Sequence, residues 1–376
     1  MVVEDMRDER VAVVGGGVIG LSVAWRLAES GYPVVLIDPS PTRGASWVAG
    51  GMLAPVTESW PGEEDVLALG AESLTQWPGF AQQLQPFGEI GLRTEGTLAL
   101  ALDSADVGTL DVLADHLHNL GREVDRLTGR QVRALEPTVG PKVRSGISVP
   151  GDLAVDNRNL LLALRQAAIG AGVQFVAERA TAVRPGMVEL GESFMDCSVA
   201  VIAAGAWSTG LHPALESVTR PVKGEILRLR TRHGTLPLPT RTIRAHVESR
   251  PVYLVPRADG ELVLGATQHE VGYDEDVTVG GVRDLLSDAE QVLPGIAEYA
   301  LTECAAGLRA GSKDNLPLIG WLEPGVLAAT GHHRNGLLLA PATAAAVLAI
   351  LRDGAAPDYA RAADPSRFRT TQGRTR

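Results

Sequence analysis

The fold of this chain is decided by residues Val11-Ala12-Val13-Val14-Gly15-Gly16-Gly17-Val18-Ile19-Gly20. The four apolar residues predict a buried strand, and the glycines after them predict a tight turn into a helix over about residues 21–30. Gly15, Gly17 and Gly20 have the spacing G-x-G-x-x-G. In that pattern each glycine has a separate purpose. The first permits the sharp turn, the second allows a pyrophosphate to approach the backbone closely, and the third allows the helix to pack on the strand. The stretch therefore predicts a dinucleotide site.

A second expected strand, over residues 34–37, ends at Asp38, which lies 18 residues after Gly20. In dinucleotide-binding folds an acidic side chain near this position accepts a hydrogen bond from the adenosine ribose. A glycine-rich turn in another kind of α/β protein would account for the glycines but not for Asp38. The strand, the turn, the helix and the acid together favour the dinucleotide site.

The composition is typical of a soluble globular protein, and it limits the kinds of partner that the protein is expected to bind. A chain of 376 residues is longer than one hydrophobic core usually serves, so we expect two domains. The net charge of −11 disfavours nucleic acid and anionic membrane as partners. Because Cys197 and Cys304 are far apart in the sequence, we expect no disulfide framework and a cytoplasmic location.

No segment of the sequence is typical of a signal peptide or a membrane span. Residues 1–10 are charged and mostly acidic, and glycines and Arg26 interrupt the apolar run that follows. Residues 337–351 are apolar, but this run has 15 residues, contains Pro341 and is too short to cross a bilayer. We therefore expect a buried helix there and no membrane partner.

The pattern of strands and helices predicts an α/β fold with two domains. Residues 198–204 form another expected buried strand, so a Rossmann-like domain would be assembled from separate segments. Expected strands at 96–102, 224–230, 252–257 and 261–266 would form a second, antiparallel sheet that covers a pocket. The expected limits are residues 8–90, 150–220 and 300–365 for the first domain, 91–149 and 221–299 for the second, and 366–376 for a flexible tail.

Four stretches, in this order, carry a resemblance to a known family: VAVVGGGVIGLSVAWRLAESGYPVVLID, GASWVAGGMLAP, AGLRAGSKDNLPLIG and GHHRNGLLLAPATAAAVL. With VIAAGAWS and PVYLVPR between them, they span nearly the whole chain. The sequence resembles the D-amino-acid oxidase superfamily of FAD enzymes. Within it, the loop ASWVAGGMLAP is most similar to the glycine oxidase branch of thiamine biosynthesis.

The resemblance implies FAD rather than a nicotinamide cofactor, with the pyrophosphate at the helix that begins near Gly17. Asp38 would hold the adenosine ribose, and Val183 would contact the adenine through its backbone. The GHHRNG loop would bring a helix N-terminus to the flavin's pyrimidine edge, where reduction leaves negative charge. The expected cofactor contacts are Gly15, Gly17, Val18, Ile19, Gly20, Asp38, Ala45, Ser46, Gly50, Gly51, Met52, Val183, Gly205, His333, Arg334, Asn335, Gly336 and Leu337.

The resemblance also implies how FAD is attached. In covalent sarcosine oxidases a cysteine in this region bonds the flavin, and its counterpart in this chain is Gly307, with Cys304 three positions away. We therefore expect non-covalent FAD.

The substrate-binding residues follow from the same resemblance. The family holds the substrate carboxylate with the arginine of its GLR motif, here Arg309, whose planar guanidinium matches a carboxylate's two oxygens. Tyr253 would hydrogen-bond the carboxylate, and Arg334 would lie at the same end of the pocket. Pro251 stands where some glycine oxidases have histidine, so one polar contact of the pocket is absent.

We hypothesise a flavoprotein oxidase that converts glycine, O2 and water to glyoxylate, ammonia and hydrogen peroxide for thiazole formation. Arg309, Tyr253 and Arg334 would form its catalytic site, without a metal. Three alternatives stay open: an oxidase or dehydrogenase of the same superfamily acting on sarcosine or small D-amino acids, a nicotinamide dehydrogenase, and a non-catalytic FAD-binding subunit. A homo-oligomer is compatible with the resemblance, but nothing in the sequence establishes one.

Overall fold

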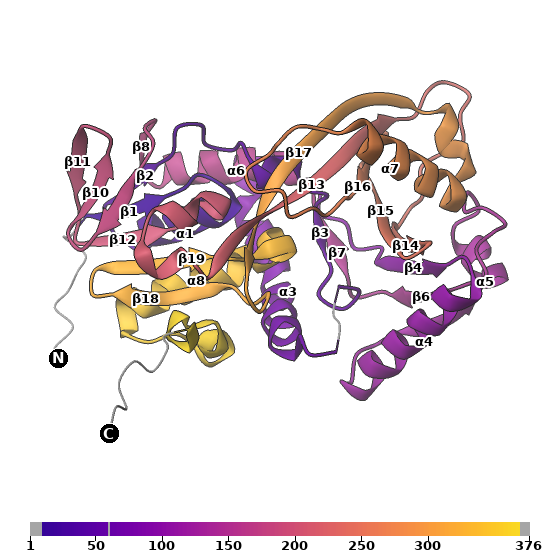
Figure 1. Ribbon diagram of the computed structural model, residues 1–376, viewed down its shortest axis with the longest axis horizontal. Helices are drawn as coiled ribbons and strands as arrows, with labels where there is room; N and C mark the ends of the chain where they lie inside the picture. The colour runs from indigo at the N-terminus through magenta and orange to yellow at the C-terminus, as the bar shows by residue number, and fades with distance from the viewer. Residues whose placement is uncertain (1–9, 59–60, 369–376) are drawn as a thin grey trace.

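The protein was analysed as a computed structural model that describes residues 10–58 and 61–368. It has two lobes, which lie to the left and right in Figure 1, and the long strands β13 (Thr219–Arg230) and β17 (Ala300–Ser312) extend from the centre into the right lobe. The expected flexible tail, residues 366–376, is ordered at its start: Pro365–Phe368 form a short 3-10 helix, and Arg367 pairs with Asp314 at 2.8 Å. The rest of that tail and residues 1–9 lie outside the described residues.

The left lobe is built on a sheet in which the described chain places six strands in the order β18-β19-β12-β1-β2-β8. All neighbouring pairs are parallel except β18 with β19. The expected Rossmann-like arrangement, assembled from separate segments, is confirmed. The strands are β1 (Val11–Val14), β2 (Val34–Ile37), β8 (Gln174–Val176), β12 (Val199–Ile202), β18 (Leu318–Glu323) and β19 (Val326–Thr330).

Both faces of this sheet are covered, and the side chains of β1 point alternately to one face and the other. Val11 and Val13 belong to one apolar cluster, which includes the buried faces of the helices, whereas Ala12 and Val14 belong to another. The second cluster includes Val183 from the small sheet of β9 (Ala182–Arg184), β10 (Met187–Leu190) and β11 (Ser193–Asp196). The covering helices are α1 (Val18–Glu29), α3 (Glu64–Leu84), α6 (Asn157–Gly170) and α8 (Gly336–Asp353).

Helix α8 is the expected buried helix. Residues 333–353 are the one helical stretch of the described chain that is long and apolar enough to cross a membrane, and 72% of its apolar window is buried inside the protein. The helix packs against α1 and α3, and Leu338 O accepts hydrogen bonds from Ser73 and from Trp77 of α3. Its apolar character therefore belongs to the core of this lobe.

The right lobe contains a sheet to which residues 97–312 contribute eight strands, in the order β17-β13-β16-β15-β14-β4-β6-β5. The expected antiparallel sheet is confirmed except that β14 and β4 pair in parallel. A parallel pair needs a long connection, and the chain between these two strands passes through the other lobe. The strands not yet given are β4 (Thr97–Ala101), β5 (Asp125–Thr128), β6 (Ser145–Val149), β14 (Thr242–Val247), β15 (Arg250–Pro256) and β16 (Glu261–Gly265).

Helices cover both faces of this sheet as well. Leu98 and Leu100 of β4 share a cluster with α7 (Val279–Val292), whereas Ala99 and Ala101 share one with α4 (Ser104–Asn119). The remaining elements are α2 (Ala45–Val48), α5 (Gly129–Leu135), the paired strands β3 (Met52–Leu53) and β7 (Leu153–Ala154), and short 3-10 helices at Gln85–Phe87, Gly205–Gly210, Pro213–Leu215, Pro294–Glu298, His333–Asn335 and Asp358–Ala363.

Strand β17 changes one expected domain limit. It pairs with β13 from Thr219↔Ser312 to Arg230↔Ala300, so residues 300–312 belong to the larger sheet and not to the Rossmann-like lobe. Alanine and glycine dominate the second half of β17, and they give a weak strand signal, because strand preference is mostly the packing of larger side chains. The other limits stay a proposal.

Candidate active site

A cavity of about 670 Å³ runs along the carboxyl ends of β1, β2, β12 and β19. Gly15, Asp38, Ala203 and Thr330 line it where these strands end, which is the place where open α/β sheets bind ligands. At its other end it reaches Arg309 of β17, so the cavity joins the two lobes. A ligand that fills it would therefore contact both lobes.

The glycine turn has the close approaches that the sequence predicted. Gly15 has a φ of +113°, and a Cβ on it would lie 2.3 Å from Ala203 O. A Cβ on Gly20 would lie 1.9 Å from Gly15 O, so the turn packs tightly against its own helix. Helix α1 begins after Gly17, which supplies no side-chain cap, and the first turn of the helix lines the cavity. Such a helix N-terminus can bind an anion, and pyrophosphate binding here stays a prediction.

Asp38 lies at the end of β2, and both of its oxygens are engaged by the turns around it. Oδ2 accepts from Gly16 N at 2.7 Å and Oδ1 from Ser40 N at 2.7 Å. The carboxylate lines the cavity, as a ribose-binding acid would. Val183 is buried behind the part of the cavity wall that Ala180 and Thr181 form. The N–H of Val183 donates to Leu211 O at 2.8 Å. Its expected contact with adenine stays a prediction.

The small-residue segment after Arg43 divides into two parts. Ala45 and Ser46 line the cavity from the short helix α2, and Ser46 Oγ accepts from Val18 N at 3.2 Å. Gly50 and Gly51 are needed for packing behind the cavity wall: a Cβ on Gly50 would meet the Tyr253 ring at 2.7 Å, and one on Gly51 would lie 2.1 Å from Val155 O. These glycines therefore fix the wall, whatever ligand it faces.

Arg309 is a cationic side chain at the end of the cavity that reaches the larger sheet. Nη1 donates to Lys223 O at 3.4 Å and to Thr267 O at 3.3 Å, and within the described residues the guanidinium makes no ion pair with a carboxylate. A Cβ on Gly224 would lie 2.3 Å from both Nη atoms, so Gly224 makes the space in which the guanidinium lies. Arg309 is thus half-buried, lines the cavity and can accept an external carboxylate.

Tyr253 is brought to the same region by β15. Burial raises the pKa of its hydroxyl, and the positive charge of Arg309 acts in the opposite direction. The hydroxyl is therefore neutral at physiological pH and can donate a hydrogen bond to a carboxylate held by Arg309. Tyr253 does not line the cavity itself, so its expected hydrogen bond to the substrate carboxylate stays a prediction.

Arg334 lies outside the lining of the cavity and is paired with acids. Its Nη2 pairs with Glu63 at 2.6 Å and donates to Glu58 O at 2.9 Å, and its Nε lies 3.6 Å from the Glu58 carboxylate. Glu58 also pairs with Arg244. Two carboxylates compensate its charge, which leaves it less available than Arg309 for an external anion, and its expected role in substrate binding stays a prediction. The sequence missed these ion pairs because Glu58 and Glu63 are far from Arg334 along the chain.

The histidines before α8 are neutral. Burial lowers the pKa of His332 to about 3, and burial together with Arg334, Arg309 and Arg220 lowers that of His333 to about 3. His332 Nε2 hydrogen-bonds to Thr343 Oγ1 at 2.9 Å, whereas the buried Nε2 of His333 has no partner among the described residues. His333 lines the cavity, so a bound group there could satisfy this nitrogen.

The start of α8 has a second uncapped helix N-terminus. Asn335 precedes Gly336 without a side-chain cap, and Gly336 lines the cavity, while Leu337 is buried beneath it. The orphaned His333 nitrogen, the glycine cradle and the two helix N-termini fit an anionic dinucleotide with a polar ring system at one end. The residues present therefore fit FAD.

The structure gathers eleven of the expected site residues around one cavity and leaves the others behind its wall or away from it. Those that line it are Gly15, Gly17, Val18, Ile19, Asp38, Ala45, Ser46, Gly205, His333, Gly336 and Arg309. Those that do not are Gly20, Gly50, Gly51, Met52, Val183, Tyr253, Arg334, Asn335 and Leu337. The sequence missed Arg43, Arg179, Thr181 and Glu275, which also line the cavity, because they lie in turns without a motif.

Asp152 is a fully buried acid next to the Arg244 and Glu58 pair. Thr57 Oγ1 donates to its Oδ2 at 2.8 Å, and burial raises the pKa of this carboxyl to about 7. An unfolded aspartate ionises near pH 3.9. The folded state therefore binds the extra proton between about pH 4 and 7, and stability is lost as the pH rises through this window.

We expect Asp152→Asn to reduce this loss of stability. Relative to the native protein, the variant should become more stable as the pH rises from 4 to 8. The change should be about a few kcal/mol in the free energy of unfolding, and the melting temperature of the variant should rise relative to that of the native protein. Thermal melts across this range measure it, with the exposed Asp115→Asn as control. Parallel melting curves for variant and native protein would contradict the assignment.

Comparisons with known proteins give the family. Residues 10–350 match the family model DAO, FAD dependent oxidoreductase. The chain is 30% identical to glycine oxidase of Geobacillus kaustophilus, and the alignment covers 89% of this chain and 90% of that protein. A crystal structure of glycine oxidase from the same organism superimposes on this chain with a TM-score of 0.87 at 29% identity, and the match covers 96% of this chain and 99% of the other.

Two further relatives have names from thiamine biosynthesis. The chain is 34% identical to a Rhizobium etli protein assigned to thiamine biosynthesis as the oxidoreductase ThiO, over 90% of this chain and 95% of that protein. It is 32% identical to the bifunctional protein ThiO/ThiG of Synechocystis, but spans 54% of that protein's length. The chain belongs to the DAO family of FAD-dependent oxidoreductases, and FAD is its cofactor.

Proposed function

We propose that this enzyme oxidises glycine with O2 and water to glyoxylate, ammonia and hydrogen peroxide. The observation that carries the proposal is the half-buried Arg309 guanidinium, which has no carboxylate partner among the described residues and lies at the end of the FAD cavity. The names of the relatives, glycine oxidase and ThiO, support this substrate and a role in supplying thiazole formation.

The residues of the site orient the substrate and need no acid or base for the redox step. Arg309 holds the carboxylate by two parallel hydrogen bonds, and Tyr253 donates a third, which fixes the direction of the α-carbon. When bound, FAD would supply the two-electron acceptor for oxidation of the Cα–H bond, with O2 as the final electron acceptor. Water then hydrolyses the imine to glyoxylate and ammonia. We place the enzyme in the cytoplasm, as its cysteine content suggests, and leave its oligomeric state open.

A peroxide assay over glycine, sarcosine, D-alanine and D-proline tests the function. We expect hydrogen peroxide with glycine, and preference over sarcosine by about 10- to 200-fold, since one methyl group discriminates by about 1–3 kcal/mol. The second candidate, an oxidase of a larger amine, is favoured if glycine is inert. Reduction of bound FAD by substrate without peroxide, but with a quinone as acceptor, would identify a dehydrogenase.

We expect Asp38→Ala to weaken FAD binding by about 10- to 100-fold, because a charge-assisted hydrogen bond contributes about 1.5–3 kcal/mol. Fluorescence titration of the apoprotein with FAD measures the dissociation constant. Asp38→Asn is the matched control for shape: it keeps one acceptor for Gly16 N and should retain more affinity. A dissociation constant unchanged in Asp38→Ala would contradict the ribose role.

A further inference from the structure

The guanidinium of Arg309 is held by two backbone carbonyls that lie in different kinds of structure. Nη1 donates to Lys223 O of β13 at 3.4 Å and to Thr267 O at 3.3 Å. Thr267 begins the irregular stretch between β16 and α7, residues 267–278, which we call the connecting segment. The same segment contributes Glu275 to the lining of the cavity. The direction of the guanidinium therefore depends on how firmly each of the two carbonyls is fixed.

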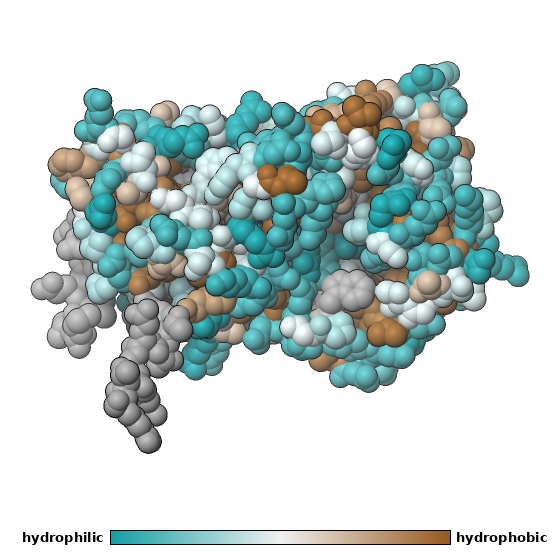
Figure 2. All heavy atoms as spheres, in the orientation of Figure 1, coloured by the Kyte–Doolittle hydropathy of each residue, from teal (hydrophilic) through white to brown (hydrophobic). Residues whose placement is uncertain are grey.

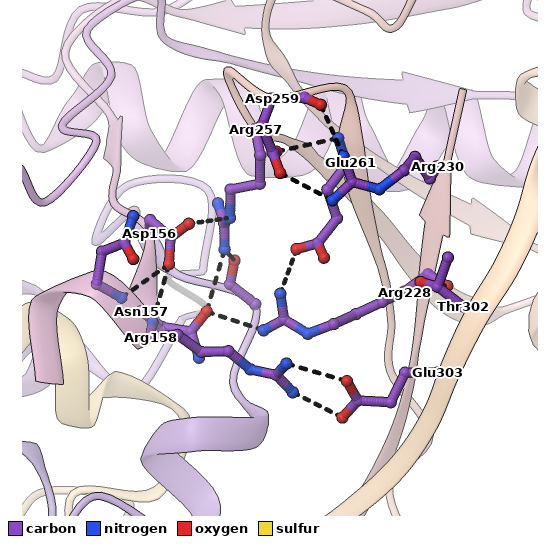
Figure 3. Close-up of polar contacts among 12 residues, drawn as sticks. Asp156, Asn157, Arg158, Arg228, Arg230, Arg257, Asp259, Glu261, Thr302 and Glu303 are labelled. Carbon is purple, nitrogen blue, oxygen red and sulfur yellow. Dashed lines mark hydrogen bonds and ion pairs between the residues drawn. The ribbon is translucent and has the colours of Figure 1, made fainter. Parts of the chain in front are cut away.

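The first carbonyl belongs to a well-anchored strand. β13 is hydrogen-bonded to β16 on one side and to β17 on the other. Farther along β13, the buried Arg228 pairs with Glu261, and its Nη2 donates to Asn157 Oδ1 of the other lobe at 3.2 Å, as Figure 3 shows. These contacts fix the strand, and with it Lys223 O.

The second carbonyl is fixed by Glu225 of β13. The carboxylate of Glu225 is fully buried, and its Oε2 accepts from Thr267 Oγ1 at 3.0 Å. Thr267 Oγ1 in turn accepts from Glu225 N at 2.9 Å, and Thr267 N donates to Glu225 O at 3.2 Å. Thr267 thus makes three hydrogen bonds to a single residue of the strand, and these bonds set the place of its carbonyl.

The other oxygen of Glu225 holds the far end of the connecting segment. Oε1 accepts from Thr278 N at 2.6 Å, at the residue that precedes α7. The buried Lys223 Nζ lies 3.9 Å from this oxygen and pairs with Asp274, in the middle of the segment, at 2.7 Å. Two charged side chains of β13 therefore anchor the segment at its start, its middle and its end.

Helix α7 leaves space for this carboxylate. A Cβ on Gly281 would lie 1.8 Å from Glu225 Oε2, whereas a Cβ on the neighbouring Gly280 would meet nothing within 4 Å. A buried carboxylate costs free energy unless hydrogen bonds and a counter-charge compensate it. In the described chain the partners of this carboxylate are Lys223 and the two ends of the connecting segment, so the buried charge orders the backbone beside Arg309.

We infer that Glu225 and Thr267 are positioning residues: by fixing Thr267 O, they aim the Arg309 guanidinium at the carboxylate that it binds. A planar guanidinium makes two parallel hydrogen bonds to a carboxylate only when the two groups face each other, so a small rotation loses one of them. Neither Glu225 nor Thr267 lines the cavity, so both act through Arg309. The inference rests on the proposed function in one respect, that Arg309 takes the substrate carboxylate.

Titration of the FAD-loaded enzyme with acetate, followed by the flavin absorbance spectrum, tests the inference without turnover. Acetate has the carboxylate of glycine but not its amine. Thr267→Val removes the hydroxyl that bonds Glu225 and should weaken acetate binding by about tenfold, whereas Thr267→Ser keeps the hydroxyl and should restore near-native affinity. Thr219→Val is the matched control, since it removes another buried, hydrogen-bonded hydroxyl of β13 and should leave acetate affinity unchanged.

Two glycines of α7 give a second test that removes no hydrogen-bonding group. Gly281→Ala displaces Glu225 Oε2 and should also weaken acetate binding, whereas Gly280→Ala should leave it unchanged. Titration of the apoprotein with FAD should give native cofactor affinity in all these variants, because none of the altered residues lines the cavity. A merely structural loss would weaken acetate and FAD binding together.

Native acetate affinity in both Thr267→Val and Gly281→Ala overturns the inference. It is also overturned if Thr267→Ser binds acetate no better than Thr267→Val, or if Gly280→Ala weakens binding as much as Gly281→Ala. Gly281→Ala decides the question if Thr267→Val does not fold. Peroxide formation is not a readout of this test, so an enzyme inert toward glycine would lose its proposed substrate, while the acetate titrations would still decide the positioning role.

Discussion

Replacing Arg309 with alanine is expected to leave FAD bound and to raise the KM for glycine by about two to three orders of magnitude. The guanidinium is half-buried, makes no ion pair in the described chain and is the cation that faces the cavity from β17. Removing one partner of a buried, hydrogen-bonded charge pair costs about 3–5 kcal/mol, because the substrate carboxylate is then left without its counter-charge. Steady-state kinetics over a wide range of glycine concentration measure the change, and the flavin absorbance spectrum checks that the cofactor is retained.

Two variants make this result specific. Gly224→Ala keeps Arg309 but places a methyl group where its Nη atoms lie, so it should raise the KM in the same direction. Arg230→Ala removes an exposed arginine of β13, the strand that also contains Gly224. Arg230 is paired with Asp259, and its replacement should leave the KM unchanged. Native-like KM values in both Arg309→Ala and Gly224→Ala would show that the carboxylate binds elsewhere.

The second large effect is expected in the glycine turn. Gly20→Ala should lower the free energy of unfolding of the apoprotein by about 1–3 kcal/mol, the usual cost of overpacking. It should also weaken FAD binding by at least an order of magnitude. A Cβ there would lie 1.9 Å from Gly15 O, which is backbone and cannot move aside as a flexible side chain would. Helix α1 must therefore shift away from β1, and its N-terminus moves relative to the pyrophosphate.

Denaturant unfolding of the apoprotein and titration with FAD measure the two consequences separately. Gly108→Ala is the matched control, since this glycine lies within α4 and its Cβ would meet nothing within 4 Å. Alanine there should be neutral or stabilising by about 0.5–1 kcal/mol. A Gly20→Ala protein that keeps native stability and native FAD affinity would refute the packing role of the third glycine.

The distribution of hydrophobic and charged side chains on the surface is that expected of an enzyme with a small-molecule substrate. Figure 2 shows a mainly hydrophilic face with hydrophobic side chains scattered across it, most visibly at the upper right. The net charge of the chain is −11, but its cavity presents three arginines, Arg43, Arg179 and Arg309, against two acids, Asp38 and Glu275. A local cationic cavity in an acidic protein attracts an anionic cofactor and a carboxylate substrate without making the whole surface a binding site for polyanions.

The sequence by itself determined the features that depend on short-range chemistry. The G-x-G-x-x-G spacing required glycine at Gly15 and Gly20 because backbone atoms approach too closely for a Cβ, and the structure shows those approaches. The buried strand β1 and the buried apolar helix α8 likewise follow from local pattern. The resemblance also identified Arg309 correctly as a residue of the cavity.

Only the tertiary structure decided which charges are compensated. Arg309 and Arg334 look alike in the sequence, but Glu58 and Glu63 pair with Arg334, and no described acid pairs with Arg309. Electrostatic interactions act through space between residues far apart in the chain, so the number of charges can be read from a sequence, but their pairing follows from the fold.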